Sequence, residues 1–421
     1  MNAITVFYLR NIADAFSSGL IFTSLYAYYV RDLGLSPFQL LLTGTVLMVT
    51  GLLFEIPTGV VADVYSRRLS VIIGGALIGV CFLLIGTIPI YAVVLLACFV
   101  EAIGDTFVSG ALEAWIADEA GVENMSHTMI RSEQLGGPAH WAGIGASVLL
   151  STRFGHNFPV IVGGALWLAL TIFLIAFMPE QAFTPKRSPA PVSWRAHMTR
   201  SLGVFAAGAR LVRRTPVLLM LLVAQVFHGA FFEPFFRLNQ AHLLTNLSLP
   251  VVSLPLIGAL DDVLWFGLID VAVTLLYFPS SEAIRRSVKS DRPAVISRAL
   301  VLLFALALIG TLTFALTGTF ALALGALLVL RVALLLTEPL IASWRNQHIP
   351  SDVRATVISM NSQASMLGQL SGGLGMGAVG NRYGLRAALS LASTFLLPLI
   401  ALFARRDTVT GAGDSTVVDP G

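Results

Sequence analysis

The stretch Gly59-Val60-Val61-Ala62-Asp63-Val64-Tyr65-Ser66-Arg67-Arg68 separates two long apolar segments, at residues 38–61 and 69–87. Each segment is long enough to cross a hydrocarbon core of about 30 Å, which takes ~20 apolar residues at about 1.5 Å per residue. A short charged turn between two spans must lie in water at a membrane face, and paired arginines favour the cytoplasmic face. The stretch therefore predicts a helical hairpin through a membrane, with its turn inside the cell.

The composition extends this prediction to the whole chain. Of its 421 residues, 56% are hydrophobic and 12% are charged, whereas a soluble domain carries about 25% charged residues. The sequence pI of about 9.0 does not call for a nucleic-acid partner, because the basic residues flank apolar segments. Cys81 and Cys98 both lie within apolar segments. We therefore expect neither a disulfide nor a metal site, and no cofactor.

Twelve apolar segments are recognisable, beginning near residues 4, 38, 69, 90, 131, 157, 216, 257, 294, 320, 355 and 386. The first carries charged side chains and lacks a basic start, so we expect a retained span and not a cleaved signal peptide. With the N-terminus inside the cell, the cytoplasmic connections hold nearly four times as many Arg and Lys residues as the outer ones. This asymmetry predicts cytoplasmic termini. The outer connections hold Arg31, Arg153, Arg237, Arg382 and Arg386.

The segments fall into two repeats, residues 1–182 and 216–406. At a constant offset of 229 residues, Trp115 matches Trp344, Gly143 matches Gly372, and Arg153-Phe154-Gly155 matches Arg382-Tyr383-Gly384. Parallel repeats of this kind are typical of one class of membrane transporter. We therefore expect two six-helix bundles.

A polar region, residues 183–215, joins the repeats. Its first part is rich in proline, and its second part is amphipathic, with an apolar face formed by Trp194, Met198, Leu202, Phe205 and Val212. We predict a helix lying on the cytoplasmic leaflet; the alternative is an unstructured linker. Residues 407–421 lack apolar periodicity, and we expect a disordered tail.

The spacing of the opening stretch resembles the signature turn between the second and third helices of the major facilitator superfamily. Gly59 is followed by Asp63 after four residues and by a basic pair after four more. Val64 stands where the family usually has a basic residue, and Ser66 stands where it usually has glycine. Residues 109–119 resemble a segment of many bacterial exporters in this superfamily.

This resemblance implies an all-α membrane protein of twelve helices that works by alternating access. It also implies a conformational gate at the cytoplasmic face, formed by Gly59, Asp63, Arg67, Arg68 and Glu113. In the gate, Asp63 would lie against the start of the eleventh span when the inner side is closed. The alternative is a simple positive-inside turn, in which Gly59 allows close packing and Glu113 lies at a solvated helix end.

Several ionisable side chains fall near the middle of the apolar segments, where an Asp or Arg costs about 2.5–3.5 kcal/mol. At about 1.5 Å per residue they reach a similar depth. They are Asp14, Glu101, His140, His228, Asp270 and Arg331. In the superfamily that the chain resembles, spans one, four, seven and ten line the central cavity. We therefore predict a substrate site formed by Arg10, His140, Trp141, His228, Asp270 and Arg331.

Asp14, Glu101 and Asp105 are the candidates for proton coupling. Asp14 and Glu101 are expected at the midplane, and Arg10 and Asp105 at a shared level nearer the cytoplasm. Two carboxylates close together in a low-dielectric cavity cannot both ionise cheaply, so one is expected to gain and lose a proton. We favour Glu101, because Arg10 stabilises the charged form of Asp14. Alternatively, Arg10 and Asp14 form a buried structural pair.

The sequence thus predicts a monomeric transporter in the inner membrane whose partners are a small-molecule substrate, protons and the lipid bilayer. In the expected pore of the first repeat, carboxylates outnumber the single basic residue Arg10, which favours proton-coupled export of amphipathic cationic or zwitterionic compounds. Proton-coupled uptake of a polar metabolite remains the alternative. A scaffold or sensor without transport is disfavoured by the charges at the midplane. We do not expect an enzyme, because no nucleophile–base pair or metal-ligand set is recognisable.

Overall fold

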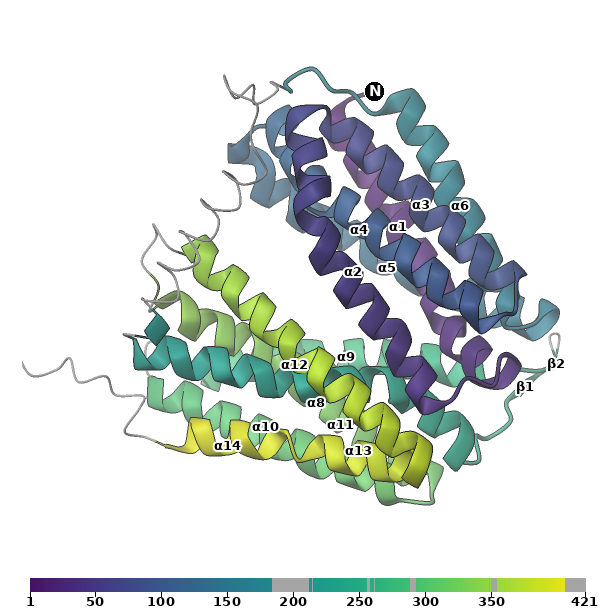
Figure 1. Ribbon diagram of the computed structural model, residues 1–421. Helices are drawn as coiled ribbons and strands as arrows, with labels where there is room; N and C mark the ends of the chain where they lie inside the picture. Colours follow the sequence, from purple (N-terminus) through teal and green to yellow (C-terminus); the bar gives the residue numbers. More distant parts are fainter. Residues whose placement is uncertain are drawn as a thin grey trace, which may run out of the picture. The chain divides into compact units, whose positions relative to one another are not determined.

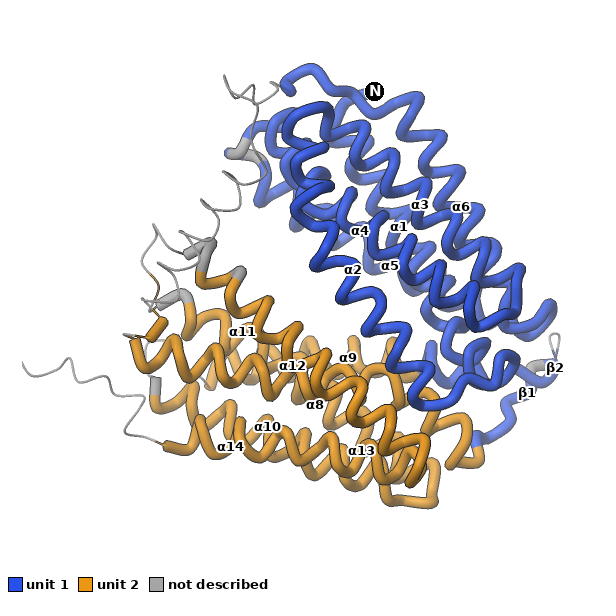
Figure 2. Tube along the Cα trace, in the orientation of Figure 1, with its two compact units in different colours: residues 1–189, 249–268 blue, residues 190–248, 269–421 orange. Residues whose placement is uncertain are grey.

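The structure, a computed structural model, describes residues 1–183, 212–213, 215–255, 258–260, 262–287, 293–347, 349 and 354–405. The chain forms two compact units (Figure 2). Unit 1 comprises Met1–Pro189 and Leu249–Leu268, and unit 2 comprises Ala190–Ser248 and Ile269–Gly421. The fold is all-α and of the predicted membrane type. Nine helices of the described residues are long and apolar enough to cross a membrane.

Unit 1 is a bundle of long helices (Figure 1). Within it α1 packs along α5, α2 along α4, and α3 against both α4 and α6. A short π-helix, η1 (Tyr28–Asp32), extends α1. The bounds of the helices are α1 (Ala3–Ala27), α2 (Pro37–Val64), α3 (Arg67–Thr87), α4 (Tyr91–Ala120), α5 (Val122–Phe154) and α6 (Asn157–Phe177).

Unit 2 repeats this plan. Its first helix α8 packs along α12, as α1 packs along α5, and α10 packs against α11, α13 and α14. The helices are α8 (Pro216–Asn246), α9 (Val263–Ser287), α10 (Pro293–Leu316), α11 (Phe320–Gln347), α12 (Arg354–Tyr383), α13 (Leu385–Ser393) and α14 (Leu396–Ala404). The start of α9 belongs to unit 1 and the remainder to unit 2. The last predicted span is thus divided into α13 and α14.

Two of the predicted helix starts are displaced. The helix α5 begins nine residues before the expected position 131, because its first turns are polar and escape a search for apolar segments. The helix α9 begins six residues after the expected position 257. The apolar residues before it instead form strand β2 (Gly258–Ala259), which pairs antiparallel with β1 (Ser253–Leu254).

The repeat matched in the sequence has a counterpart in the structure. A Cβ added to Gly143 would collide with the carbonyl oxygen of Phe16, and one added to Gly372 would collide with the carbonyl oxygen of Ala230. Both collisions lie at the crossing of the first and fifth helices of a repeat, where only glycine lets the backbones approach this closely. The matched residues Gly155 and Gly384 both have positive φ, +97° and +86°. Each permits the sharp turn into the last helix of its repeat.

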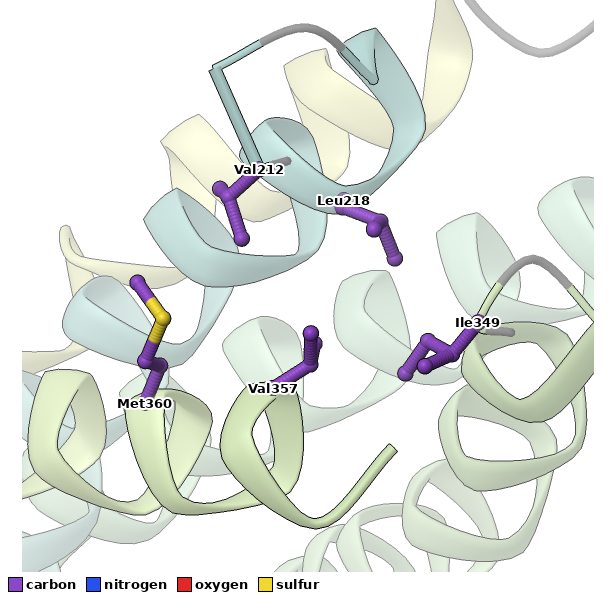
Figure 3. Close-up of a cluster of buried hydrophobic side chains, with 5 residues drawn as sticks. All are labelled: Val212, Leu218, Ile349, Val357 and Met360. Carbon is purple, nitrogen blue, oxygen red and sulfur yellow. The ribbon is translucent and has the colours of Figure 1, made fainter. Parts of the chain in front are cut away.

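The region between the repeats is described only at its two ends. Val212 is buried at the start of unit 2 with Leu218, Ile349, Val357 and Met360, where α8 and α12 come together (Figure 3). This residue of the predicted amphipathic face is therefore buried within unit 2, and the interfacial helix stays a prediction. The remaining residues of that face, Trp194, Met198, Leu202 and Phe205, lie outside the described residues, as does the predicted tail, residues 407–421.

Candidate functional site

Arg10 and Asp14 form an ion pair one turn apart on α1. Nη1 of Arg10 lies 3.0 Å from Oδ2 of Asp14 and donates a second hydrogen bond, of 2.7 Å, to Oδ1 of Asn11. Arg10 is 7% exposed, while the Asp14 side chain is 32% exposed. The guanidinium is thus buried in the helix bundle, and the carboxylate is partly exposed at its surface.

Two neighbouring helices hold this pair in place. Nδ2 of Asn11 donates a hydrogen bond of 2.5 Å to Oγ of Ser132 on α5. The Arg10 guanidinium carbon lies 5.5 Å from the ring centroid of Trp167 on α6, a cation–π contact. Three helices therefore fix the Arg10 guanidinium. Ser132 and Trp167 were not predicted, because nothing in the sequence indicates which residue of another helix faces Arg10.

Asp105 on α4 adds a second carboxylate to the pair. Its charge interacts with those of Asp14 and Arg10, and its side chain is exposed. We refer to Arg10, Asp14 and Asp105 as the acidic cluster; it carries two carboxylates and one guanidinium. Glu101, one turn earlier on α4, is half-buried and interacts electrostatically with the buried side chains of Tyr29 and Cys81. The predicted pairing of Glu101 with Asp14 stays a prediction.

In unit 2, two of the predicted residues meet directly. Nη2 of Arg331 on α11 lies 3.1 Å from Oδ1 of Asp270 on α9. The side chains are 32% and 35% exposed, so neither partner is sealed inside unit 2. The pair connects two helices, and ionisable side chains within membrane spans usually pair with one another in this way.

His228 on α8 lies between aromatic rings and a carboxylate. Its ring stacks on Phe232, with centroids 5.9 Å apart, and meets Phe304 edge-on at 6.4 Å. It also interacts electrostatically with Glu338 on α11, which is exposed. Sequence reasoning missed Glu338, although a carboxylate within an apolar helix next to Pro339 is the same kind of signal that identified Asp14.

A further ion pair lies wholly within α8. Nε of Arg237 is 2.5 Å from Oε1 of Glu233, and the two residues are 9% and 3% exposed. Assigning Arg237 to an outer connection was therefore wrong. The helix α8 continues to Asn246 because the residues after Arg237 include the buried apolar side chains Ala241, Leu243 and Leu244.

His140 and Trp141 occupy neighbouring positions on α5 with different surroundings. Nδ1 of His140 lies 3.3 Å from the carbonyl oxygen of Ala15 on α1, so the ring has a backbone hydrogen-bond partner. Trp141 is 38% exposed and presents its indole at the surface of unit 1. Their assignment to the substrate site stays a prediction.

The opening turn is held by residues far along the chain. Oγ of Ser66 accepts a hydrogen bond of 2.9 Å from the Leu69 amide and donates one of 2.6 Å to Oε2 of Glu180. Oε1 of Glu180 accepts a hydrogen bond of 2.9 Å from the Arg68 amide. Ser66 thus caps α3, and the Glu180 carboxylate lies at its positive N-terminus.

The two arginines of the turn bond to the ends of other helices. Nη1 of Arg67 donates a hydrogen bond of 2.7 Å to the carbonyl oxygen of Ala114 and forms an ion pair with Asp118, both on α4. Nη2 of Arg68 donates one of 2.5 Å to the carbonyl oxygen of Ile175 on α6. Sequence reasoning missed Asp118 and Glu180, which lie 51 and 112 residues away from their partners.

The other predicted gate residues lie around this turn. Glu113 is exposed on α4, one turn before Asp118, and Asp63 is half-buried in the last turn of α2. A Cβ added at Gly59 would meet no atom of unit 1 within 4 Å, so its predicted role in close packing has no support within this unit. The contact between Asp63 and the start of the eleventh span stays a prediction.

Comparison with known proteins identifies the family. Residues 8–373 match the family model described as Major Facilitator Superfamily. The chain belongs to that family. An uncharacterised MFS-type transporter of Bacillus subtilis (strain 168), YxaM, is 23% identical over 401 residues, which are 95% of each chain.

Solved structures of other transporters share the fold. The nucleoside transporter NupG matches with a TM-score of 0.71 and 14% identity, over 96% of this chain and 98% of that one. A POT family transporter bound to a thioalcohol-conjugated peptide matches with a TM-score of 0.71 and 13% identity, over 97% and 96%. The protein is therefore a multi-pass integral membrane transporter of the major facilitator superfamily.

Proposed function

We propose that this transporter couples the movement of protons to the export of small amphipathic compounds that carry a positive charge or are zwitterionic. The acidic cluster carries this proposal. It places two carboxylates, Asp14 and Asp105, around one guanidinium that is withdrawn from solvent. A site with one unneutralised carboxylate attracts either a proton or a cationic group.

Competition between these two ligands gives antiport by alternating access. Arg10 remains charged and is fixed by Asp14, Asn11 and Trp167. It neutralises only one carboxylate at a time, and an uncompensated charge within the bilayer costs about 2.5–3.5 kcal/mol. A bound proton or cation removes that cost. The transporter therefore switches the side of the membrane to which the site opens when either of them is bound.

Within the acidic cluster, Asp105 is the preferred proton carrier. Its charge interacts with those of Asp14 and Arg10, and its side chain is exposed, so protons reach it. Glu101, which the sequence favours, is the alternative carrier one turn away on the same helix. The exposed indole of Trp141 offers an apolar contact for the uncharged part of a substrate.

Purified protein in proteoliposomes tests this function. With an acidic lumen, antiport drives a model amphipathic cation such as ethidium into the vesicles, whereas proton symport drives substrate outward. We expect uphill accumulation that falls at least about ten-fold in Asp14→Asn and Asp105→Asn. Glu123→Gln, at an exposed carboxylate in the first turn of α5, is the matched control. Uphill accumulation in both cluster variants would move proton coupling to Glu101 or Glu338.

Uptake of a polar metabolite by proton symport is the second candidate. Unit 2 supports it, because Asp270 and Arg331 form an accessible pair that suits a zwitterion, and Glu338 lies near His228. Similar folds include a nucleoside transporter and a POT family transporter in complex with 5-aminolevulinic acid. Accumulation of nucleosides or small zwitterions driven by an acidic exterior would favour this candidate over export.

The opening turn is proposed to act as a latch of the closed inner side, at the cytoplasmic face of the inner membrane. Asp63 would stabilise the positive N-terminus of the eleventh span by roughly 0.3–1 kcal/mol, and by up to ~2 kcal/mol if partly buried. Asp63→Asn should therefore raise the labelling of single cysteines placed on the inner side. Unchanged labelling on both sides would exclude this latch. We further propose that the transporter functions as a monomer.

A further inference from the structure

An apolar groove of about 300 Å³ lies in unit 2 between α9, α10 and α11. Its lining includes Leu276 and Ser280 of α9, Leu303 and Leu306 of α10, and Val329 and Leu336 of α11. Ser280 is the single polar side chain of the lining. A groove of this composition offers aliphatic contact but no group that orients a polar solute.

The groove is open at the surface of unit 2. Leu276, Leu306 and Val329 are 44%, 37% and 50% exposed. In unit 1, α2 packs closely along α4, whereas the corresponding helices of unit 2, α9 and α11, have no comparably close packing among the described residues. The Asp270–Arg331 pair connects these two helices, and the groove begins within two turns of it. The space therefore results from α9 standing away from its neighbours.

Positive charge collects at one end of the groove. Arg285 and Arg286 follow Ser280 on α9, about 7–9 Å further along the helix at ~1.5 Å per residue. Both bond to the single carboxylate of Glu282, with Nε–Oε distances of 2.6 Å, and their side chains are 74% and 75% exposed. Arg298 is exposed on α10, which begins at the same end. These four side chains carry an excess of two positive charges.

From this arrangement we propose that the groove binds an anionic glycerophospholipid. One acyl chain lies between α9 and the α10–α11 pair, and the phosphate lies against Arg285, Arg286 and Arg298. The separation of about 7–9 Å between Ser280 and the arginines is close to the ~5–8 Å thickness of the headgroup layer. The lipid fills the space beside α9 and holds that helix, with Asp270, in position. This proposal does not depend on the substrate or direction of transport.

Selectivity for an anionic lipid over a zwitterionic one must come from the headgroup. An acyl chain gains little by moving from the bilayer into an apolar groove, because both surroundings are apolar. Each arginine near an anionic headgroup adds roughly a five-fold preference. With the charge of one arginine offset by Glu282, we expect phosphatidylglycerol to bind at least about ten-fold more tightly than phosphatidylcholine with identical chains.

Native mass spectrometry of the full-length protein, titrated with these two lipids, tests the assignment. The double variant Arg285→Gln/Arg286→Gln should bind the two lipids equally, and Val329→Trp, which fills the groove, should bind neither at this site. Arg382→Gln, at an exposed arginine at the far end of α12, is the control for charge. Leu322→Trp, at an exposed residue of α11 outside the lining, is the control for bulk. Both should bind as wild type does.

Three outcomes would overturn the proposal. The first is equal binding of the two lipids by the wild type, and the second is selectivity that survives Val329→Trp. The third is binding of ethidium that neither lipid displaces and that Val329→Trp abolishes, which would assign the groove to transported compounds. Thermal unfolding of each variant in detergent distinguishes loss of the site from loss of the fold.

Discussion

In α1 of unit 1, the buried Arg10 interacts with Asp14 and Asp105, whose side chains are at least partly exposed at the surface of the unit, whereas in α8 of unit 2 Glu233 and Arg237 are both buried. The two helices occupy the same place in their repeats, and each carries an ion pair with a spacing of four residues. The carboxylate of the first pair is partly exposed, with 32% of the Asp14 side chain accessible, whereas only 4% of the Glu233 side chain is accessible. We therefore assign the proposed proton coupling to the exposed carboxylates of unit 1, and a structural role to the buried pair of unit 2.

The largest expected loss of unfolding free energy follows from removing one partner of the buried Glu233–Arg237 pair. Arg237→Met leaves Glu233 buried without its cation, and breaking a buried ion pair in this way costs about 3–5 kcal/mol of unfolding free energy. Arg10→Met should cost less, about 1–3 kcal/mol, because Asp14 is partly exposed. Titration of the detergent-solubilised variants with sodium dodecyl sulfate measures both.

A double variant distinguishes the effect of leaving one charge unpaired from the effect of substitution at these two positions. Replacing both partners, as Glu233→Leu/Arg237→Met, removes the buried charge and should return the stability to within about 1 kcal/mol of wild type. If Arg10→Met proved the more destabilising of the two single variants, the division into a partly exposed pair and a buried pair would be wrong.

The second prediction concerns a feature that the two units share. Gly143→Ala and Gly372→Ala each place a methyl group against a backbone carbonyl oxygen, of Phe16 and of Ala230. Because neither backbone moves easily, we expect each to lose about 1–3 kcal/mol of unfolding free energy. The loss should be similar in the two units if the crossings are equivalent.

Neighbouring glycines on the same helices provide the controls. A Cβ at Gly145 or at Gly375 meets no atom within 4 Å. Gly145→Ala and Gly375→Ala should therefore gain up to about 1 kcal/mol from helix propensity alone. If all four variants had the same stability, the two crossings would not be as close as the structure indicates.

These two comparisons indicate which features of the fold can be predicted from the sequence. The all-α membrane fold and the repeat were predicted because hydrophobic length and matched residues such as Gly143 and Gly372 are local signals. Predicted helix bounds were less accurate where a helix contains polar turns or is longer than a membrane span requires. The helix α5 begins with polar turns, and α8 continues beyond the position at which a span of ~20 residues would end.

The candidate site was predicted as a set of residues, but not as a set of contacts. Asp14, Asp105, Asp270 and Arg331 stood out because charge within an apolar segment is costly. Their partners did not stand out. Trp167 contacts Arg10, and Glu180 contacts Ser66, across 157 and 114 residues of sequence. A single sequence carries no signal for such contacts, which depend on how helices rotate and pack.

The smallest predicted effect compares the opening turn with its counterpart in unit 2. Arg67 and Arg68 bond to other helices, and the carboxylate of Glu180 accepts hydrogen bonds from Ser66 and the Arg68 amide. Arg285 and Arg286 instead bond to Glu282 on their own helix and are largely exposed.

Glu180→Gln removes a negative charge from the N-terminus of α3. It should lower the unfolding free energy by about 0.3–2 kcal/mol, and less at high salt. Glu282→Gln should leave it unchanged, because exposed ion pairs contribute little. The same titration, at low and at high salt, measures both variants. Equal losses in the two would show that the turn of unit 1 is no more firmly held than that of unit 2. A loss in Glu180→Gln alone, diminished by salt, would show that the carboxylate stabilises α3 through its charge.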